Sequence, residues 1–346
     1  MDLSGAVQQT FWHLLSAARG AIAVGVNAAW TLSNPNAPEE ADFVAGLVHK
    51  TVPVLARDWS AVLAPVGIHL SVASVYCHQS PKVEYAGIAP RNSCELGDIL
   101  FAHFHTPLFG RPWRRSILYQ AKASSSQPHT LGANELHQMR LYTHWPDFTY
   151  VSPSPLTGAR RYVSPKRAHS GARYMQIDDR QPTDPLTGMT GVPGYFPIGT
   201  CSPGPTLSNL VSLDLELTLW AAGAAGRPFL PRPQSAKTSG WSRVIWDLID
   251  NGLKRPFTRS RTGYVGYPRI PTPRPPELDG TCFVAAYPGR VLSTASEVLG
   301  VDRADFLVRS ACSDRPPPSQ SWEESSEGEG GVSIVLVETV EGERPG

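Results

Sequence analysis

The chain has 346 residues, of which 41% are hydrophobic and only 18% are charged, which excludes a mostly disordered protein and permits a sizeable buried core. Its 31 basic and 30 acidic residues give a net charge of +1, which excludes a uniformly basic nucleic-acid coat protein but not a local basic groove. Residues 313–346 carry a net charge of −6 and residues 1–312 carry +7, which fits a polyanion-binding body with a solvating tail and equally fits an ordinary surface.

The first part of the chain is predicted to be helical. Residues 6–31 have apolar side chains at helical spacing, which predicts one helix, or two helices broken near Gly20. A further helix is predicted to begin at residues 38–40, where a proline precedes two acids that favour a first helical turn. The helical spacing continues to residue 63, and we expect a kink at Pro53.

After Gly67 the apolar period changes to two, which predicts strands. In chain order we expect three strands, a helix and two more strands, at residues 68–76, 98–104, 116–122, 131–145, 148–151 and 173–177. Apart from one extra strand, the order over residues 39–178 is helix, three strands, helix and strand. This order is typical of an α/β sandwich with a central meander and a crossover helix.

The rest of the chain is predicted to be rich in loops, with helices at residues 207–224, 241–251 and 293–299. An apolar run near the end predicts a strand at residues 332–340, which we expect to pair with an edge of the main sheet. We therefore predict an N-terminal helical segment (1–38), a core (39–190), a helical and loop-rich accessory region (191–312), a disordered acidic linker (313–331), and a C-terminal strand and tail (332–346).

The five cysteines stand far apart and form no CxxC pair, which predicts reduced thiols in a cytoplasmic protein, with a zinc site as the alternative. No apolar run is long enough to span a bilayer, so we expect no membrane contact. The sequence has neither a GxxxxGK nor a GxSxG motif, so it indicates neither ATP-driven work nor a Ser-His-Asp hydrolase.

The residues most informative about chemistry lie at the ends of two predicted strands. Asp98 opens one strand, and Gln120 and Lys122 close the next. Gln120 and Lys122 lie on the same face of their strand, because successive side chains alternate between its two faces. If the two strands pair as antiparallel neighbours, Asp98 lies close to Gln120 and Lys122. This set suits metal-assisted phosphodiester hydrolysis, in which Asp98 and the Gln120 amide oxygen hold Mg²⁺ or Mn²⁺ and Lys122 orients or deprotonates the attacking water.

Gly97-Asp98 before an apolar run, with Gln120-Ala121-Lys122 at the end of the next strand, resembles the PD-(D/E)xK nuclease superfamily. The Gln variant of the motif is similar to that of Mrr-type restriction endonucleases. The resemblance implies a restriction-endonuclease-like α/β fold with an αβββαβ core, to which the helices predicted after residue 206 add a mainly helical C-terminal extension. It also implies that Asp98 and Gln120 are metal-site positions and that Lys122 is the catalytic lysine.

The same resemblance suggests additional metal ligands. The family often adds a glutamate from the first core helix, for which Glu39 and Glu40 are candidates, and Glu95 is a candidate for an extra ligand. His103 and His105 could bind a transition metal as a His-x-His pair, but we favour a structural role for both.

Two basic groups that include aromatic neighbours are candidates for nucleic-acid contacts. The first lies in the hairpin loop that enters the lysine strand, where we expect it near the metal: Arg111, Arg114 and Arg115. The second lies in a loop before the last core strand: Arg160, Arg161, Lys166 and Arg167. The alternative for both groups is a solvated loop.

Together these features predict a cytoplasmic, divalent-metal-dependent endonuclease that hydrolyses DNA in prokaryotic restriction or defence. Its expected partners are DNA and either a second copy of the chain or a partner protein of a defence system. The first alternative is a catalytically inactive nuclease-like fold that binds nucleic acid or protein, and the second is a small-molecule enzyme of unrelated type. The observation that separates nuclease from binding module is whether Asp98, Gln120 and Lys122 converge.

Overall fold

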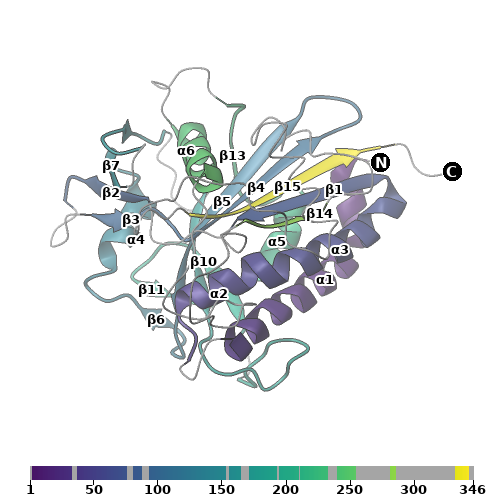
Figure 1. The fold of residues 1–346 in the computed structure, drawn as a ribbon, viewed down its shortest axis with the longest axis horizontal. Helices are drawn as coiled ribbons and strands as arrows, with labels where there is room; N and C mark the ends of the chain where they lie inside the picture. Colours follow the sequence, from purple (N-terminus) through teal and green to yellow (C-terminus); the bar gives the residue numbers. More distant parts are fainter. Residues whose placement is uncertain are drawn as a thin grey trace, which may run out of the picture.

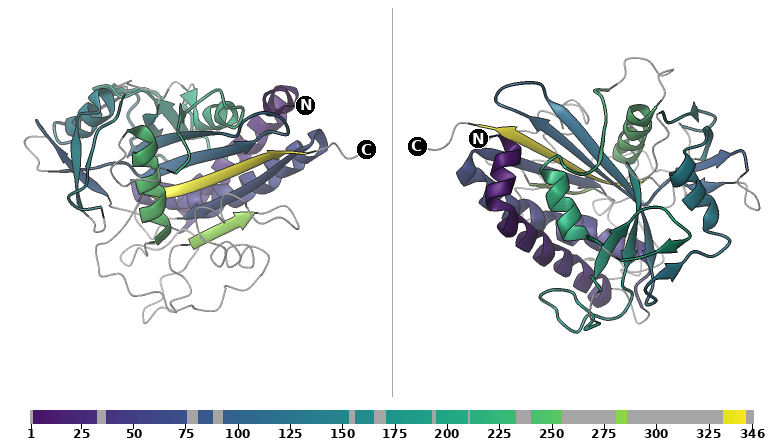
Figure 2. Two further views of the ribbon diagram at one scale, coloured as in Figure 1. Left: turned by 90° about the horizontal axis from the view of Figure 1, so that it is seen from above. Right: turned by 180° about the vertical axis from the view of Figure 1, so that it is seen from behind.

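In a computed structural model of the chain, the structure describes residues 2–32, 37–75, 81–87, 93–152, 156–164, 171–192, 195–209, 211–232, 240–254, 281–285 and 332–342. These residues form a mixed α/β fold in which helices cover both faces of one large sheet (Figure 1, Figure 2). The predicted α/β class is therefore confirmed. None of the helices in these ranges is long and apolar enough to cross a lipid bilayer.

The large sheet contains most of the strands. Its order is β12 (Val211–Ser212), β10 (Ile198–Cys201), β9 (Ala172–Ile177), β5 (Trp113–Ala123), β4 (Ile99–Thr106), β15 (Ser333–Glu341), β1 (Ile68–Val75) and β14 (Thr281–Ala285), and β13 (Arg227–Pro228) pairs with β5 beside this row. β4 and β5 are antiparallel, whereas β5 and β9 are parallel. The parallel pair requires a crossover, which runs through helix α4 (Leu136–His144).

One face of this sheet is covered by α1 (Leu3–Leu32), α2 (Glu40–Gly46), the π-helix η1 (Leu47–Thr51), α3 (Val52–Leu63) and α5 (Leu213–Ala221). Of the two predicted possibilities, one helix or two helices broken near Gly20, the structure shows one, since α1 continues through Gly20. A 3₁₀ turn, η2 (Ala64–Val66), follows α3. The irregularity expected at Pro53 takes the form of η1, which ends two residues before this proline. A proline supplies no amide N–H, and a π-helical turn accommodates the disturbed hydrogen-bond ladder.

The opposite face is covered by α4, α6 (Trp241–Lys254) and a small sheet. That small sheet has the order β3 (Cys94–Glu95), β2 (Lys82–Tyr85), β7 (Phe148–Ser152) and β8 (Arg160–Arg161). A second small sheet joins β11 (Thr206–Leu207) to β6 (His129–Thr130). The predicted strand at residues 148–151 therefore exists, but it belongs to the small sheet and not to the core sheet.

The C-terminal strand occupies a different position from the one predicted. β15 lies between β1 and β4, antiparallel to the first and parallel to the second, so the expected edge pairing and the uninterrupted central meander are both wrong (Figure 2). Residues 333–339 are buried on both faces of the sheet. A nearly continuous apolar run such as Ile334–Val337 is typical of a strand covered on both sides, since an edge strand facing water would alternate.

In the described part of the accessory region, helices α5 and α6 occur together with short strands. Its strands β10 and β12 extend the large sheet from β9. Helix α5 begins only at Leu213, six residues later than predicted, because Thr206–Leu207 and Val211–Ser212 pair as strands. Similarly, α4 begins at Leu136 and not at residue 131. The predictions for residues 293–299 and 313–331 lie outside the described residues.

Two glycines set the distance between α1 and α2. A Cβ atom added to Gly46 would lie 2.4 Å from the carbonyl oxygen of Gly25, closer than any side chain can approach. We expect Gly46→Ala to lower the free energy of unfolding by about 1–3 kcal/mol, because the two helix backbones must separate. Urea denaturation measures this loss. Gly20→Ala is the matched control, since no atom lies within 4 Å of its added Cβ and alanine favours a helix interior. Equal stability of the two variants would contradict the tight contact.

Candidate functional site

The pairing of β4 with β5 places the start of β4, next to Asp98, beside the end of β5, which carries Gln120 and Lys122. Ile99 pairs with Tyr119, so Asp98, one residue earlier, is placed beside the end of β5 that carries Gln120. The Asp98 amide donates a hydrogen bond to the Tyr119 carbonyl at 2.9 Å, and the Ala121 amide donates to Asp98 Oδ2 at 2.7 Å. The aspartate is therefore fixed against the lysine strand by two backbone contacts.

Lys122 is held by two carboxylates from different helices. Its Nζ lies 3.0 Å from Glu135 Oε1, just before α4, and 3.6 Å from Glu40 Oε2, at the start of α2. The side chain is 13% exposed. Glu40 also accepts a hydrogen bond from the Ala123 amide at 3.2 Å, so the first turn of α2 contacts the end of β5. Of the two glutamate candidates, Glu40 reaches the lysine, and Glu39 forms the capping box of α2 with Asp42.

Gln120 is buried, and its amide oxygen accepts a hydrogen bond from Gln138 of α4. Gln138 also donates to the Glu95 carbonyl at 3.1 Å, and the Tyr142 hydroxyl donates to the Leu96 carbonyl at 2.7 Å. The residues leading to Asp98 are thus held by one face of α4. Sequence reasoning missed Glu135, Gln138 and Tyr142, although their spacing of three and four residues indicates a shared helical face.

These groups surround a polar cavity of about 660 Å³. The cavity is bounded by α2, β2, β3, β5 and α4, and its lining includes Glu40, Lys82, Ser93, Cys94, Glu95, Gln120, Lys122, Asn134, Glu135, His137 and Gln138. Asp98 is not among these lining residues, but it interacts electrostatically with three of them, namely Glu95, Glu40 and Lys122. The structure therefore brings five predicted site residues to one place: Asp98, Gln120, Lys122, Glu40 and Glu95.

The electrostatics of the site show a surplus of negative charge. Burial raises the pKa of Asp98 well above its ordinary value, the charges of Glu95 and Glu40 add to this rise, and the Ala121 amide and Lys122 oppose it. Burial by itself lowers the pKa of Lys122, but Glu40, Glu135 and Asp98 outweigh it and the pKa is raised. Lys122 therefore remains charged at neutral pH, whereas Asp98 resists ionisation until positive charge is added.

The raised pKa of Asp98 predicts a pH-dependent stability. Because the folded protein retains a proton that the unfolded chain loses near pH 4, stability falls as the pH rises from about 4 through the raised pKa. We expect Asp98→Asn to unfold at a higher temperature than the unsubstituted chain at pH 7 in EDTA. The difference should disappear at about pH 3, where both states are protonated. Thermal melts followed by circular dichroism test this, and a lower melting temperature for Asp98→Asn at pH 7 would contradict it.

The side chains around the cavity offer mainly oxygen donors to a metal ion. Among the described residues, no group of three or more His, Cys, Asp or Glu side chains is arranged to hold one. The carboxylates and the Gln120 amide are oxygen donors of the kind that Mg²⁺ accepts, often with only one or two protein ligands. Structural zinc sites take four ligands, mostly Cys and His, whereas the cavity lining includes one residue of each type, Cys94 and His137. The residues present therefore fit a magnesium-type ion better than zinc.

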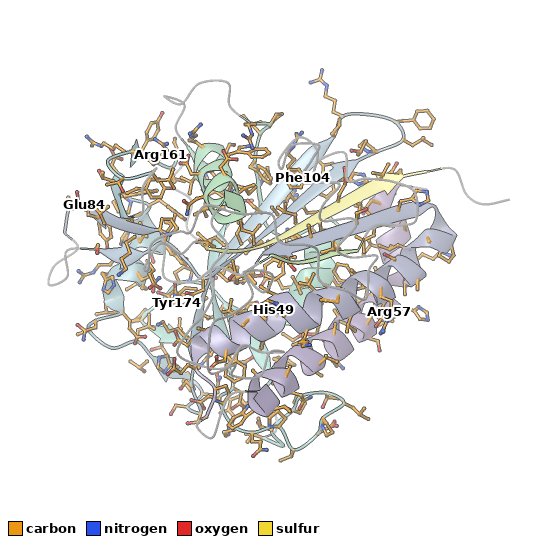
Figure 3. The ribbon with its side chains drawn as sticks, in the orientation of Figure 1. His49, Arg57, Glu84, Phe104, Arg161 and Tyr174 are labelled. Carbon is orange, nitrogen blue, oxygen red and sulfur yellow. The ribbon has the colours of Figure 1, made fainter. Side chains whose placement is uncertain are left out.

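The first predicted basic group lies away from this cavity. His105 pairs with Trp113, so the loop between β4 and β5 is at the opposite end of these strands from Asp98, about 26 Å away at 3.3 Å per residue. Phe104 marks that end of β4 in Figure 3. Arg111 is exposed there, Arg114 lies over the Phe104 ring, and Arg115 donates to the Gly226 carbonyl. The expectation that this loop lies near the metal-site residues is therefore wrong.

The second basic group is divided. Arg161 is buried and pairs with Asp247 of α6 at 2.7 Å, so its charge joins the small sheet to a helix (Figure 3). Arg160 is exposed and pairs with Asp147 at 3.0 Å. Lys166 and Arg167 lie outside the described residues. Because its charge is already neutralised in the interior, Arg161 is not available to a phosphate.

The two histidines of β4 lie in the protein interior, where they contact the C-terminal strand. His103 and His105 are buried, and both contact the Thr339 hydroxyl of β15, at 2.7 and 2.9 Å. His105 also lies 3.2 Å from Glu341. These contacts tie β4 to the C-terminal strand, in keeping with the structural role preferred for the pair.

Comparison with known proteins gives no relative for this arrangement. The chain matches no family model, no curated protein and no solved structure. The functional argument therefore rests on the geometry and chemistry of the cavity.

Proposed function

We propose that the chain is a divalent-metal-dependent nuclease with a PD-(D/E)xK-like core that hydrolyses phosphodiester bonds of DNA. The observation that carries the proposal is that Asp98 lies beside the end of β5, where the Gln120 and Lys122 side chains line one polar cavity. The element order supports it in part, because α3, β1, β4, β5, α4 and β9, which is parallel to β5, come in this order in the chain, with short strands of the small sheets between them. The insertion of β15 between β1 and β4 departs from the simple meander of such a core.

The metal-site residues would be Asp98 and Gln120, with Glu40 or Glu95 as a further ligand. A bound Mg²⁺ or Mn²⁺ supplies positive charge that offsets the phosphate charge and makes water more acidic. Lys122 retains its proton, so its ammonium group can donate hydrogen bonds to a phosphate oxygen and orient the attacking water. Gln138 holds the Gln120 amide in one orientation through their hydrogen bond.

The proposed setting is cytoplasmic restriction or defence, with the chain acting as a homo-oligomer or with a partner protein. The unpaired thiols of Cys94 and Cys201 support a reducing compartment. A second function, a nuclease-like fold that binds nucleic acid or protein without cleaving it, is favoured by one observation. Both carboxylates near Lys122 already pair with it, and the second metal position is a neutral amide.

A cleavage assay with the full chain tests the proposal. Single-stranded DNA, double-stranded DNA and RNA are each incubated with Mg²⁺, with Mn²⁺ and with EDTA, and Asp98→Asn serves as the control for contaminating nuclease. We expect metal-dependent cleavage of DNA by the unsubstituted chain alone. Binding of DNA without cleavage in either metal would favour the second function. The absence of both binding and cleavage would refute the nuclease and leave only a fold that binds protein.

A further inference from the structure

The cavity contains two lysines that differ in how they are neutralised. Lys122 contacts Glu135 and Glu40, so its charge is already balanced by the protein. Lys82 of β2 lines the same cavity and is exposed, and within the described ranges it forms no ion pair. The lining also includes the carboxylates of Glu40, Glu95 and Glu135. A polyanion that enters the cavity therefore needs an unbalanced positive charge, and Lys82 supplies one.

The strand that carries Lys82 is held in place as a wall of the cavity. Its residues alternate between exposed and buried, so Val83 and Tyr85 face the interior while Lys82 faces outward. The Tyr85 hydroxyl donates a hydrogen bond to the His137 carbonyl of α4, on the cavity side of that helix. Across the small sheet, Lys82 is paired with Glu95 of β3, whose charge acts on Asp98. The lysine is thus placed beside the metal-site carboxylates by a fixed strand.

We propose that Lys82 binds a backbone phosphate of the substrate next to the one that is cleaved, an inference that rests on the proposed nuclease function. The lysine ammonium is a compact charge with three hydrogen-bond donors on a flexible stem, which suits a phosphate that must be admitted without regard to base sequence. Exposure of Lys82 permits this contact without the cost of desolvating a buried charge. In this cavity the charge of Lys122 is balanced by carboxylates of the protein and serves the reaction, whereas the charge of Lys82 is available to a phosphate and increases the affinity for the substrate.

Binding measured without cleavage tests this assignment. The probe is a fluorescein-labelled single-stranded DNA oligonucleotide, and fluorescence anisotropy is measured in Ca²⁺ with the full chain over a range of salt concentrations. We expect Lys82→Ala to weaken binding about five- to tenfold at about 50 mM salt and to reduce the log–log salt slope by roughly 0.7, the value for one phosphate contact on a single strand. Lys82→Arg should restore both quantities, because the charge is retained.

Arg57→Ala is the matched control, because Arg57 is an exposed cation of α3, which covers the face of the large sheet opposite the small sheet that carries Lys82. Its affinity and salt slope should equal those of the unsubstituted chain. If Lys82→Ala also binds like the unsubstituted chain, the role of Lys82 is refuted while the nuclease proposal stands. If the unsubstituted chain binds neither this oligonucleotide nor the same sequence as a duplex, the nuclease proposal fails and the role of Lys82 fails with it.

Discussion

Lys122→Met will abolish metal-dependent cleavage while the protein remains folded. The expected loss in kcat is about 10²- to 10⁴-fold, the contribution of a positioned proton donor or acceptor, and the added loss of charge stabilisation acts in the same direction. Methionine keeps the length and the apolar stem of lysine, so packing at the end of β5 is preserved. Only the ammonium group that contacts Glu135 and Glu40 is removed.

The measurement is initial cleavage rate in Mg²⁺, with oligonucleotide binding in Ca²⁺ and a thermal melt on the same preparation. Lys50→Met is the matched control, since Lys50 is half-buried in η1 and is not part of the cavity lining. Its cleavage rate should stay within about twofold of the unsubstituted rate, as surface changes outside a site usually perturb the protein little. Cleavage by Lys122→Met at the unsubstituted rate would refute the catalytic assignment of Lys122.

Val335→Asp will prevent the chain from folding stably. Val335 is fully buried in β15, between β1 and β4, and packs in the core beneath the N-terminal helices. A carboxylate at this position has no partner, and an uncompensated buried charge costs about 3–5 kcal/mol. The loss of the buried valine adds to this cost, and the sum is a large part of the 5–15 kcal/mol that stabilises a typical domain.

Circular dichroism and urea denaturation measure the effect. The control is Val340→Asp, because Val340 lies near the end of the same strand and is only partly buried. This variant should remain folded and lose about 1 kcal/mol or less. If Val335→Asp were as stable as Val340→Asp, β15 could not be a central strand of the sheet.

Much of the site follows from local sequence. A hairpin between two alternating strands must be antiparallel, so the start of the first strand lies beside the end of the second, and Asp98 meets Gln120 and Lys122. The same reasoning places the Arg111 loop at the other end of the hairpin. Since the antiparallel pairing of β4 and β5 brings Asp98 to Lys122, it also excludes a position of the hairpin loop near these residues. The helical pattern before Gly67 was equally local, and α1, α2 and α3 follow it.

The sequence by itself determined the N-terminal helices, the hairpin and the three residues at its open end, because each depends on neighbours in the chain. Only the tertiary structure decided that β15 lies between β1 and β4, and that Glu135 and Lys82 share a cavity with Lys122. Pairing between strands more than 200 residues apart depends on which surfaces remain to be buried once the local elements have formed. The apolar pattern and its spacing indicate that a segment is buried, but they do not identify the strands that will form hydrogen bonds with its backbone.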